Sequence, residues 1–281
     1  MNRATPSTIT LLGLTVLLTT AITYATNTPA SVLSAQVESF CESAGGERGG
    51  PLVQVSADAQ PLRIVAIGSS STQGAGASGP AYSYVSQLGA RLNAVWPSHT
   101  EVINKGVGGN TLADIVARAP QDLYALHPNL VILQTGMNDA LQGVPVAVYK
   151  TQLLHFVREI RAHQIPVILV DNQYLPDWVG TAEYQAIQGA THKVASTTGS
   201  SLVSRYGLSV TLQAKAHLAA SALLSDDGLH PNDVMHACTA SALEATIVKL
   251  SRPEKVARSG CCVFRSYAAS DSDRMRRPIL A

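Results

Sequence analysis

Short apolar runs alternate with longer amphipathic segments along most of the chain. Clear apolar runs occupy residues 62–67, 101–104, 130–133 and 166–170, and a weaker one occupies 201–203. Runs of this length are typical of parallel strands that are buried on both faces. The intervening segments have the length and spacing of amphipathic helices, near residues 80–95, 111–126, 145–163, 181–198 and 232–250.

This alternation predicts a single doubly wound, flavodoxin-like α/β/α sandwich of three layers with about five parallel strands, because parallel neighbours need crossover helices. We expect the domain to span residues 61–250 without an internal boundary. Residues 26–60 are small and polar with little periodicity, which predicts a linker. Residues 251–281 are polar and basic and lack a core pattern, so we expect a tail that is mobile.

Residues 1–25 have the layout of a secretory signal peptide. They carry one charge, at Arg3, followed by an apolar stretch over residues 11–25 and then by small residues. The apolar stretch is shorter than the roughly 20 residues that span a bilayer comfortably, so an uncleaved membrane anchor is the second interpretation. The sequence therefore predicts a secreted or periplasmic protein with no stable membrane insertion once the signal is removed.

The overall charge narrows the class of partner. The chain has 20 Lys and Arg residues against 19 Asp and Glu residues, with 46% apolar and 14% charged residues. A nearly neutral chain has no broad electrostatic field with which to recruit nucleic acid or an anionic membrane. We expect a small-molecule partner instead.

Four cysteines lie outside the predicted signal: Cys41, Cys238, Cys261 and Cys262. An exported chain meets an oxidising compartment, which favours a disulfide. The spacing lacks the paired pattern of a zinc site, so no metal is expected. Three pairings are possible, and the preferred one joins Cys41 to Cys238; free buried thiols are the alternative.

The residues that follow the apolar runs carry the candidate chemistry. Ser70 follows the first run, Gly109 the second and Asn138 the third, and Asp227 and His230 stand near the end of the predicted domain. Ligands of open parallel sheets bind beyond the carboxyl ends of the strands, so these residues are expected to meet at one edge.

A serine at such an edge needs help to act as a nucleophile. It requires an imidazole to take its proton and a carboxylate to orient that imidazole, which His230 and Asp227 supply. The backbone at Gly109 and the side-chain amide of Asn138 are suitable donors for a tetrahedral oxyanion. This chemistry needs no cofactor.

The order of these segments resembles that of the SGNH hydrolase (GDSL-type esterase) family. The four blocks of that family carry a serine, a glycine, an asparagine and a histidine, which match Ser70, Gly109, Asn138 and His230. The match runs from about residue 62 to residue 240. The first block of the family usually reads Gly-Asp-Ser, whereas Ser69 takes the aspartate position here.

The resemblance implies a role for each residue. Ser70 is the nucleophile, the Asp227-x-x-His230 pair completes the triad, and Ser70, Gly109 and Asn138 form the oxyanion hole. The neighbouring serines Ser69 and Ser71 are the alternatives to Ser70 as nucleophile, and Gly108 is the alternative to Gly109 as oxyanion donor. The predicted function is an exported serine esterase that hydrolyses small-molecule or glycan-linked acyl esters through an acyl-enzyme.

Three other functions are compatible with parts of this sequence. An acyltransferase acting on a glycan uses the same residues, and an envelope or carbohydrate-binding module keeps the fold without the chemistry. Residues 74–79 formally spell the G-x-G-x-x-G dinucleotide fingerprint, but residues 69–73 separate them from the end of the first apolar run. Nucleotide binding is therefore not expected.

Overall fold

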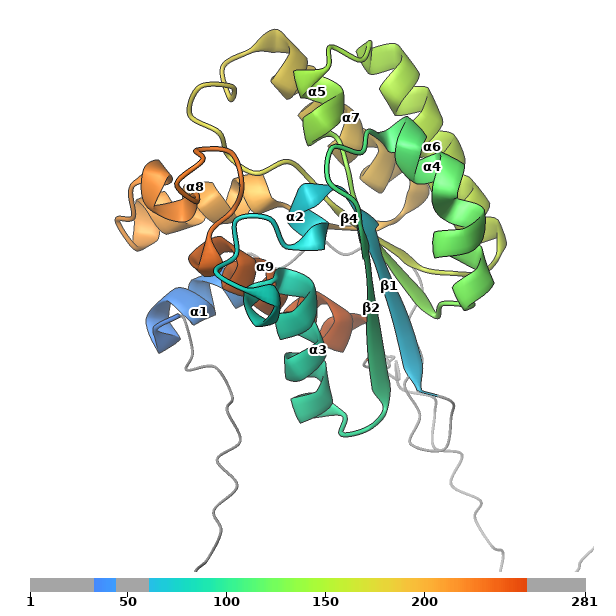
Figure 1. Cartoon of the computed structure of the whole chain (residues 1–281), viewed down its shortest axis with the longest axis horizontal. Helices are drawn as coiled ribbons and strands as arrows, with labels where there is room; N and C mark the ends of the chain where they lie inside the picture. Colours follow the sequence, from blue (N-terminus) through green and yellow to red (C-terminus); the bar gives the residue numbers. More distant parts are fainter. Residues whose placement is uncertain (1–32, 44–60, 252–281) are drawn as a thin grey trace, which may run out of the picture.

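A sheet of parallel strands in the order β2-β1-β3-β4-β5 forms the centre of the domain in the computed structural model (Figure 1). The structure describes residues 33–43 and 61–251. The strands are β1 (Leu62–Gly68), β2 (Thr100–Gly106), β3 (Leu130–Gln134), β4 (Val167–Val170) and β5 (Ser201–Val203). This strand order is that of flavodoxin-like folds, and the predicted fold class is confirmed.

Helices cover both faces of the sheet (Figure 1). The longer ones are α1 (Ala35–Ser43), α3 (Tyr84–Val95), α4 (Leu112–Asp122), α6 (Val146–Ala162), α7 (Ala182–Thr198), α8 (Arg205–Lys215) and α9 (Asp233–Ser251). Two short helices, α2 (Ser70–Gln73) and α5 (Met137–Leu141), begin directly after β1 and β3. The five helices expected from the sequence are present.

Alternate residues of the strands enter two separate cores, which explains the unbroken apolar runs. In β1, Ile64 and Ala66 pack in the core beneath α1, α3, α8 and α9. Val65 and Ile67 pack on the opposite face beneath α4, α6 and α7. All four side chains are fully buried, so neither face of this strand tolerates a polar side chain.

Helix α8 was not predicted from the sequence. Its first turn is capped by Ser204, whose Oγ accepts a hydrogen bond from Gly207 N at 2.9 Å. This segment contains three weak helix formers, Gly207, Ser209 and Thr211, so its sequence indicates a helix only weakly. Packing of Leu208 and Leu212 into the core stabilises the helix instead.

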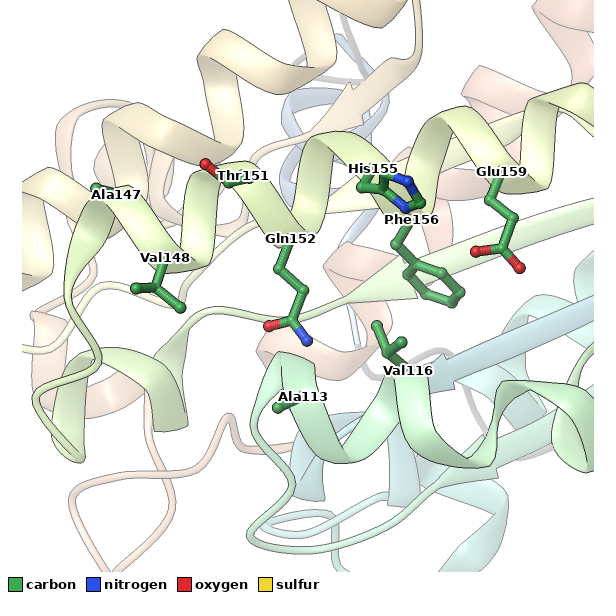
Figure 2. A pocket seen from close by; sticks show the side chains of 9 residues that line it. All are labelled: Ala113, Val116, Ala147, Val148, Thr151, Gln152, His155, Phe156 and Glu159. Atoms are coloured by element: carbon green, nitrogen blue, oxygen red, sulfur yellow. The ribbon is translucent and has the colours of Figure 1, made fainter.

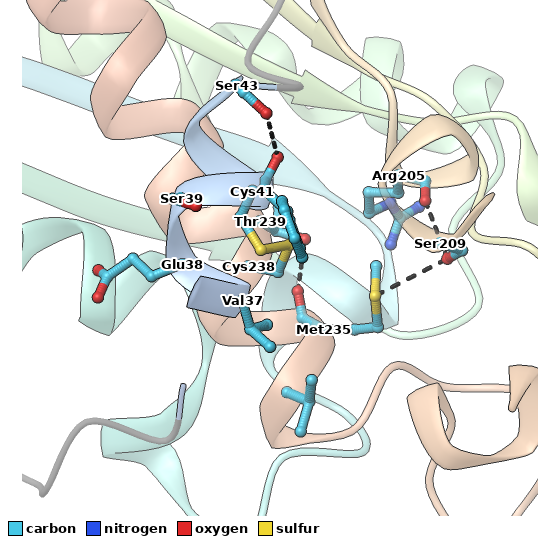
Figure 3. Close-up of a disulfide and its surroundings, with 12 residues drawn as sticks. Val37, Glu38, Ser39, Cys41, Ser43, Arg205, Ser209, Met235, Cys238 and Thr239 are labelled. Carbon is cyan, nitrogen blue, oxygen red and sulfur yellow. Dashed lines mark hydrogen bonds between the residues drawn. A yellow bond between two sulfur atoms is a disulfide. The ribbon is translucent and has the colours of Figure 1, made fainter. Parts of the chain in front are cut away.

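Helix α1 lies within the segment that the sequence predicted to be a linker. A disulfide joins Cys41 of α1 to Cys238 of α9, as preferred from the sequence (Figure 3). Arg91 of α3 adds ion pairs to Glu38 of α1 at 2.6 Å and to Glu244 of α9 at 3.1 Å. A helix of nine residues has little stability by itself and depends on packing against α9. Local periodicity therefore did not predict it.

Several predictions concern residues outside those that the structure describes. They are the signal or anchor over residues 1–25, most of the 26–60 linker, the tail beyond residue 251 and the state of Cys261 and Cys262. Within the described ranges, no helix is both long enough and apolar enough to cross a membrane.

Loss of the disulfide is expected to destabilise the domain. The bridge closes a loop between residues separated by 197 positions, so the double variant Cys41→Ser/Cys238→Ser should lose about 2–5 kcal/mol of unfolding free energy. Urea unfolding measures this loss. A reductant should lower the wild-type stability to the same value and leave the double variant unchanged. A double variant within about 0.5 kcal/mol of wild type would contradict the prediction.

Candidate active site

Ser70, His230 and Asp227 form a continuous chain of hydrogen bonds at the carboxyl edge of the sheet. His230 Nε2 lies 2.9 Å from Ser70 Oγ, and His230 Nδ1 lies 2.6 Å from Asp227 Oδ2. Ser70 is the first residue of α2, directly after β1, and the other two residues precede α9. The structure therefore brings together the three residues that the sequence selected.

The electrostatics of Asp227 determine which ring nitrogen carries the proton. Burial by itself would raise the pKa of Asp227, but hydrogen bonds from the His230 ring, from backbone N–H groups and from Ser225 hold that pKa well below its usual value. Asp227 is therefore a carboxylate, which only accepts hydrogen bonds. His230 Nδ1 donates to it, and Nε2 is free to accept from the Ser70 hydroxyl.

The three-residue spacing of Asp227 and His230 follows from a tight turn. Asp227 Oδ1 accepts hydrogen bonds from Leu229 N and His230 N, each at 2.9 Å. Gly228 has a φ of 67°, a left-handed conformation that glycine adopts without strain. Ser225 N donates to His230 O at 2.8 Å and closes the turn. The aspartate thus orients both the backbone and the ring of the histidine.

Gln134, the last residue of β3, holds the turn that carries Ser70. This side chain is fully buried, and its Oε1 accepts three hydrogen bonds at 3.0 Å, from Ser69 N, Ser69 Oγ and Thr72 Oγ1. Asn104 Nδ2 adds a bond to Thr72 O at 2.8 Å. Gln134 was not among the predicted site residues, although a polar residue at the end of an apolar run was a signal for it.

The turn after β2 lies against the proposed nucleophile. A side chain at Gly108 would place its Cβ 3.9 Å from Ser70 Cβ, and Gly108 N donates to Gln73 Oε1 at 3.0 Å. Gly109 has a φ of 77°, and no atom lies within 4 Å of the position its Cβ would occupy. The N–H of Gly108 is thus already engaged, whereas Gly109 borders open space.

Asn138 connects α5 to the same turn. Its Nδ2 donates to Asn110 O at 2.8 Å, and Arg118 holds the Asn110 side chain by donating to its Oδ1 at 2.7 Å. Arg118 also donates to Gly68 O at the end of β1 at 2.9 Å. Asp139 Oδ1 accepts a hydrogen bond from Leu112 N at 3.1 Å. These bonds join the ends of β1, β2 and β3 into one rim.

The G-x-G-x-x-G sequence forms a loop that packs against His230. A Cβ at Gly76 would lie 2.2 Å from Pro231 O and 2.8 Å from His230 Cβ, and the φ of Gly76 is 85°. Ser78 N and Oγ donate to the two oxygens of Asp233 at 2.8 and 2.6 Å. These glycines therefore permit close approach to the histidine turn.

The side chain of His236, in α9, also holds this loop in place. Its Nδ1 accepts from Tyr84 N, and its Nε2 donates to Ala75 O, both at 3.1 Å. Burial lowers the pKa of His236 to about 4, so the ring is neutral at physiological pH.

An aromatic and aliphatic cluster borders the histidine turn on its other side. Leu229 packs with the cluster of Met137, Leu175 and Tyr184, which half-buried Trp178 and Tyr206 extend. Gln173 Nε2 donates to Leu229 O at 3.0 Å and fastens the loop after β4 to this turn. The cluster thus places apolar side chains next to the turn that carries His230.

A separate groove lies between α4 and α6 (Figure 2). Its lining includes neither Ser70 nor His230 and consists of Ala113, Val116, Ala147, Val148, Thr151, Gln152, His155, Phe156 and Glu159. Across residues 33–43 and 61–251, no group of three or more His, Cys, Asp or Glu side chains is arranged to hold a metal ion.

A model of the Non-GDSL lipase-like family matches residues 48–252, well over half of the chain. The chain belongs to this family. The resemblance to SGNH hydrolases drawn from the four sequence blocks is confirmed. All of the residues in the triad and the proposed oxyanion hole lie inside the matched range.

Several relatives are named as esterases or thioesterases. The chain is 27% identical over 143 residues to thioesterase 1/protease 1/lysophospholipase L1 of Escherichia coli (strain K12), which covers 51% of this chain and 65% of that protein. It is 40% identical over 57 residues to an acetylxylan esterase of Geobacillus stearothermophilus. This match covers 20% of this chain and 26% of that protein. The chain thus spans less than two thirds of the length of these relatives.

Solved structures share the fold. A two-domain esterase active on acetylated mannans superposes with a TM-score of 0.62 at 23% identity, covering 82% of this chain and 60% of that one. LAE5, an α/β hydrolase enzyme from the metagenome of Lake Arreo, superposes with a TM-score of 0.59 at 26% identity. This match covers 68% of this chain and 97% of LAE5. These two matches show that the chain shares its fold with solved esterase and hydrolase structures.

Gly76 is expected to be essential for the position of His230. Gly76→Ala places a methyl group against Pro231 O and His230 Cβ, so the ring should shift and phosphonylation of Ser70 by a serine-directed phosphonate should slow by about a hundredfold. Gly143→Ala is the matched control, because Gly143 also has a positive φ, of 67°, but has no atom within 4 Å of its Cβ position. Equal labelling rates in the two variants would refute the prediction.

His236 is expected to make stability depend on pH. Its folded pKa of about 4 lies below the value of about 6.5 for an unfolded histidine, so the unfolded chain binds more protons between these values. Stability should therefore be complete above pH 6.5 and fall as the pH is lowered toward 4, by up to about 1.4 kcal/mol per pH unit. Urea unfolding across this range should show a shallower slope for His236→Gln. An unchanged slope would show that His236 is not the source of this pH dependence.

Proposed function

We propose that this chain is an exported serine esterase that hydrolyses carboxylic esters through Ser70, His230 and Asp227. The observation that carries the proposal is the pair of hydrogen bonds of 2.9 and 2.6 Å that joins these side chains in the order hydroxyl, imidazole and carboxylate. Membership of a lipase-like family and esterase relatives support the reaction class. Export rests on the signal-like pattern of residues 1–25.

The reaction proceeds in two acyl transfers. Ser70 Oγ attacks the ester carbonyl while His230 Nε2 takes its proton, and the C–O bond to the alcohol breaks as His230 returns that proton to the leaving oxygen. Water then attacks the acyl-enzyme, with His230 again taking and returning one proton, and the acid leaves. Asp227 stabilises the imidazolium formed in both steps and needs no proton of its own.

The oxyanion is proposed to bind to the backbone N–H groups of Ser70 and Gly109 and to the Asn138 side chain. Gly109 is favoured over Gly108 because the N–H of Gly108 already donates to Gln73. An asparagine amide has two N–H donors, and that of Asn138 uses one on Asn110 O. The second donor remains for the developing charge.

The substrate class is proposed from the surroundings and the relatives. The cluster around Leu229 and Trp178 suits the acyl or alcohol portion of a small-molecule or glycan-linked ester. An acetylxylan esterase and a thioesterase/lysophospholipase stand among the relatives, so the length of the acyl group is the variable to measure. A p-nitrophenyl ester series from acetate to decanoate on the full chain distinguishes these classes.

The two rival functions give different results with the same protein. A binding module would show no stoichiometric labelling by a serine-directed phosphonate. An acyltransferase would be labelled, but it would pass the acyl group to an added glycan in preference to water. Phosphonate labelling at Ser70, together with release of free acid from an ester substrate by the unlabelled protein in the presence of the glycan, supports the esterase.

Ser70→Ala and His230→Ala should each lower kcat/KM for p-nitrophenyl acetate by at least roughly a thousandfold, because each removes a member of the proposed triad. His155→Ala is the control histidine, since His155 lies in the α4–α6 groove. Its activity should stay at the wild-type level. Retention of most activity in either triad variant would refute the assignment.

Asn138→Ala should cost less, on the order of a hundredfold in kcat, because one of three oxyanion donors is removed. KM should change little if the amide acts in the transition state. Steady-state kinetics with p-nitrophenyl acetate separate the two parameters. A loss no larger than twofold would exclude Asn138 from this role.

A further inference from the structure

Arg118 uses every nitrogen of its guanidinium in a hydrogen bond. Nε donates to Asn110 Oδ1 at 2.7 Å, Nη2 donates to Gly68 O at 2.9 Å, and Nη1 donates to Asp122 Oδ2 at 3.0 Å. The side chain, in α4, is largely buried. A guanidinium is planar and rigid, so it holds these three partners at a fixed spacing.

Two of these partners adjoin the proposed oxyanion donors. Gly68 ends β1, two residues before Ser70, whose backbone N–H is the first donor. Asn110 directly follows Gly109, which supplies the second donor. The carbonyl oxygen of Asn110 accepts from Nδ2 of Asn138, the side chain that supplies the third, at 2.8 Å. One guanidinium is thus connected to all three donors, each by at most two residues of backbone or one further hydrogen bond.

The second half of the turn after β2 depends most on this connection. In the first half, Gly108 N donates to Gln73 Oε1 at 3.0 Å. In the second half, the N–H of Asn110 reaches Val107 O only at 3.4 Å. Gly109 has a φ of 77° and open space around its Cβ position, so its own backbone is weakly constrained. The short bond from the guanidinium to the Asn110 side chain therefore restrains the neighbouring N–H that is proposed to bind the oxyanion.

Asp122 and Lys105 hold the guanidinium itself. Asp122 is one helical turn beyond Arg118 on α4, the spacing at which two such side chains meet. Its other oxygen accepts from Lys105 Nζ, in β2, at 3.1 Å. With one nitrogen bound to this carboxylate, the other two nitrogens keep defined directions toward Asn110 and Gly68.

We propose that Arg118 is the positioning residue of the oxyanion hole. This role rests on the proposed esterase function: the guanidinium sets the ends of β1 and β2 so that the three donors converge on one oxygen. Arg118 itself touches neither the substrate nor the reacting atoms. Oxyanion donors act most strongly in the transition state, so their displacement lowers kcat more than it raises KM. A residue that only joined the strand ends would change the free energy of unfolding and leave kcat of the folded protein unaltered.

Steady-state kinetics with p-nitrophenyl acetate test this role on the full chain with its disulfide intact, well below the unfolding midpoint. Arg118→Met should lower kcat by about tenfold to a hundredfold and change KM little, because the donors are displaced but not removed. Arg118→Lys should stay close to Arg118→Met, since an ammonium keeps the charge without the planar fork. The pH dependence of kcat/KM should keep its wild-type shape, because the Asp227–His230 pair is untouched.

Arg63→Met is the matched control. Arg63 lies near the amino end of the same strand, β1. It likewise binds a carboxylate, that of Glu101 at 2.7 Å, and a backbone carbonyl, Leu126 O at 3.0 Å. The control variant should lose stability while its kcat stays within about twofold of the wild-type value. Equal losses of kcat in the two variants would overturn the proposal.

Asn110→Ala gives a second test that does not depend on how Arg118→Met folds. It removes the Oδ1 acceptor of the 2.7 Å bond, so kcat should again fall while KM changes little. The double variant Asn110→Ala/Arg118→Met should lose less than the product of the two single losses, because both changes remove the same bond.

The outcomes separate this proposal from the proposed function. A kcat within about twofold of wild type in Arg118→Met or in Asn110→Ala would overturn the role of Arg118 and leave the esterase assignment standing. A loss in the double variant equal to the product of the single losses would do the same. Wild-type protein that neither hydrolyses the ester nor is labelled by the phosphonate would overturn both.

Discussion

The hydrogen bond between Ser70 Oγ and His230 Nε2 imposes the strictest constraint on this fold. It joins the first residue of the short helix α2 to a turn that lies 160 residues further along the chain. A displacement of about 1 Å at such a pair is enough to weaken catalysis severely. The surrounding structure therefore has to position a turn after β1 and a turn before α9 against one another.

Support for this contact comes from both sides. Gln134 holds the Ser70 turn from within the sheet, where β3 lies beside β1. Helix α9 supports the His230 turn: its first residues bind the 74–79 loop through Asp233 and His236, and Cys238 follows within the next turn. The disulfide and α1 thus act on the same end of the helix that presents the histidine.

Local sequence patterns were sufficient for the fold class and for the choice of candidate residues. Buried parallel strands need apolar side chains on both faces, and crossover helices need amphipathic spacing. Both requirements produce hydrophobic patterns that can be recognised within a few residues. Ser70, Gly109, Asn138 and His230 each follow a recognisable turn, and Asp227 stands in the same turn as His230. Helices α1 and α8 left weaker marks because packing, not propensity, stabilises them.

The sequence by itself determined the strand and helix alternation and the candidate site residues, and it favoured one of three possible cysteine pairings without selecting it. Only the tertiary structure decided which polar side chains hold those residues in place: Gln134 under Ser70, Gly76 and His236 around His230, and Arg118 between two strand ends. The physical reason is distance along the chain. Periodicity and turn chemistry act over a few residues, whereas a hydrogen bond or a close backbone approach between distant segments exists only after the helices have packed on the sheet.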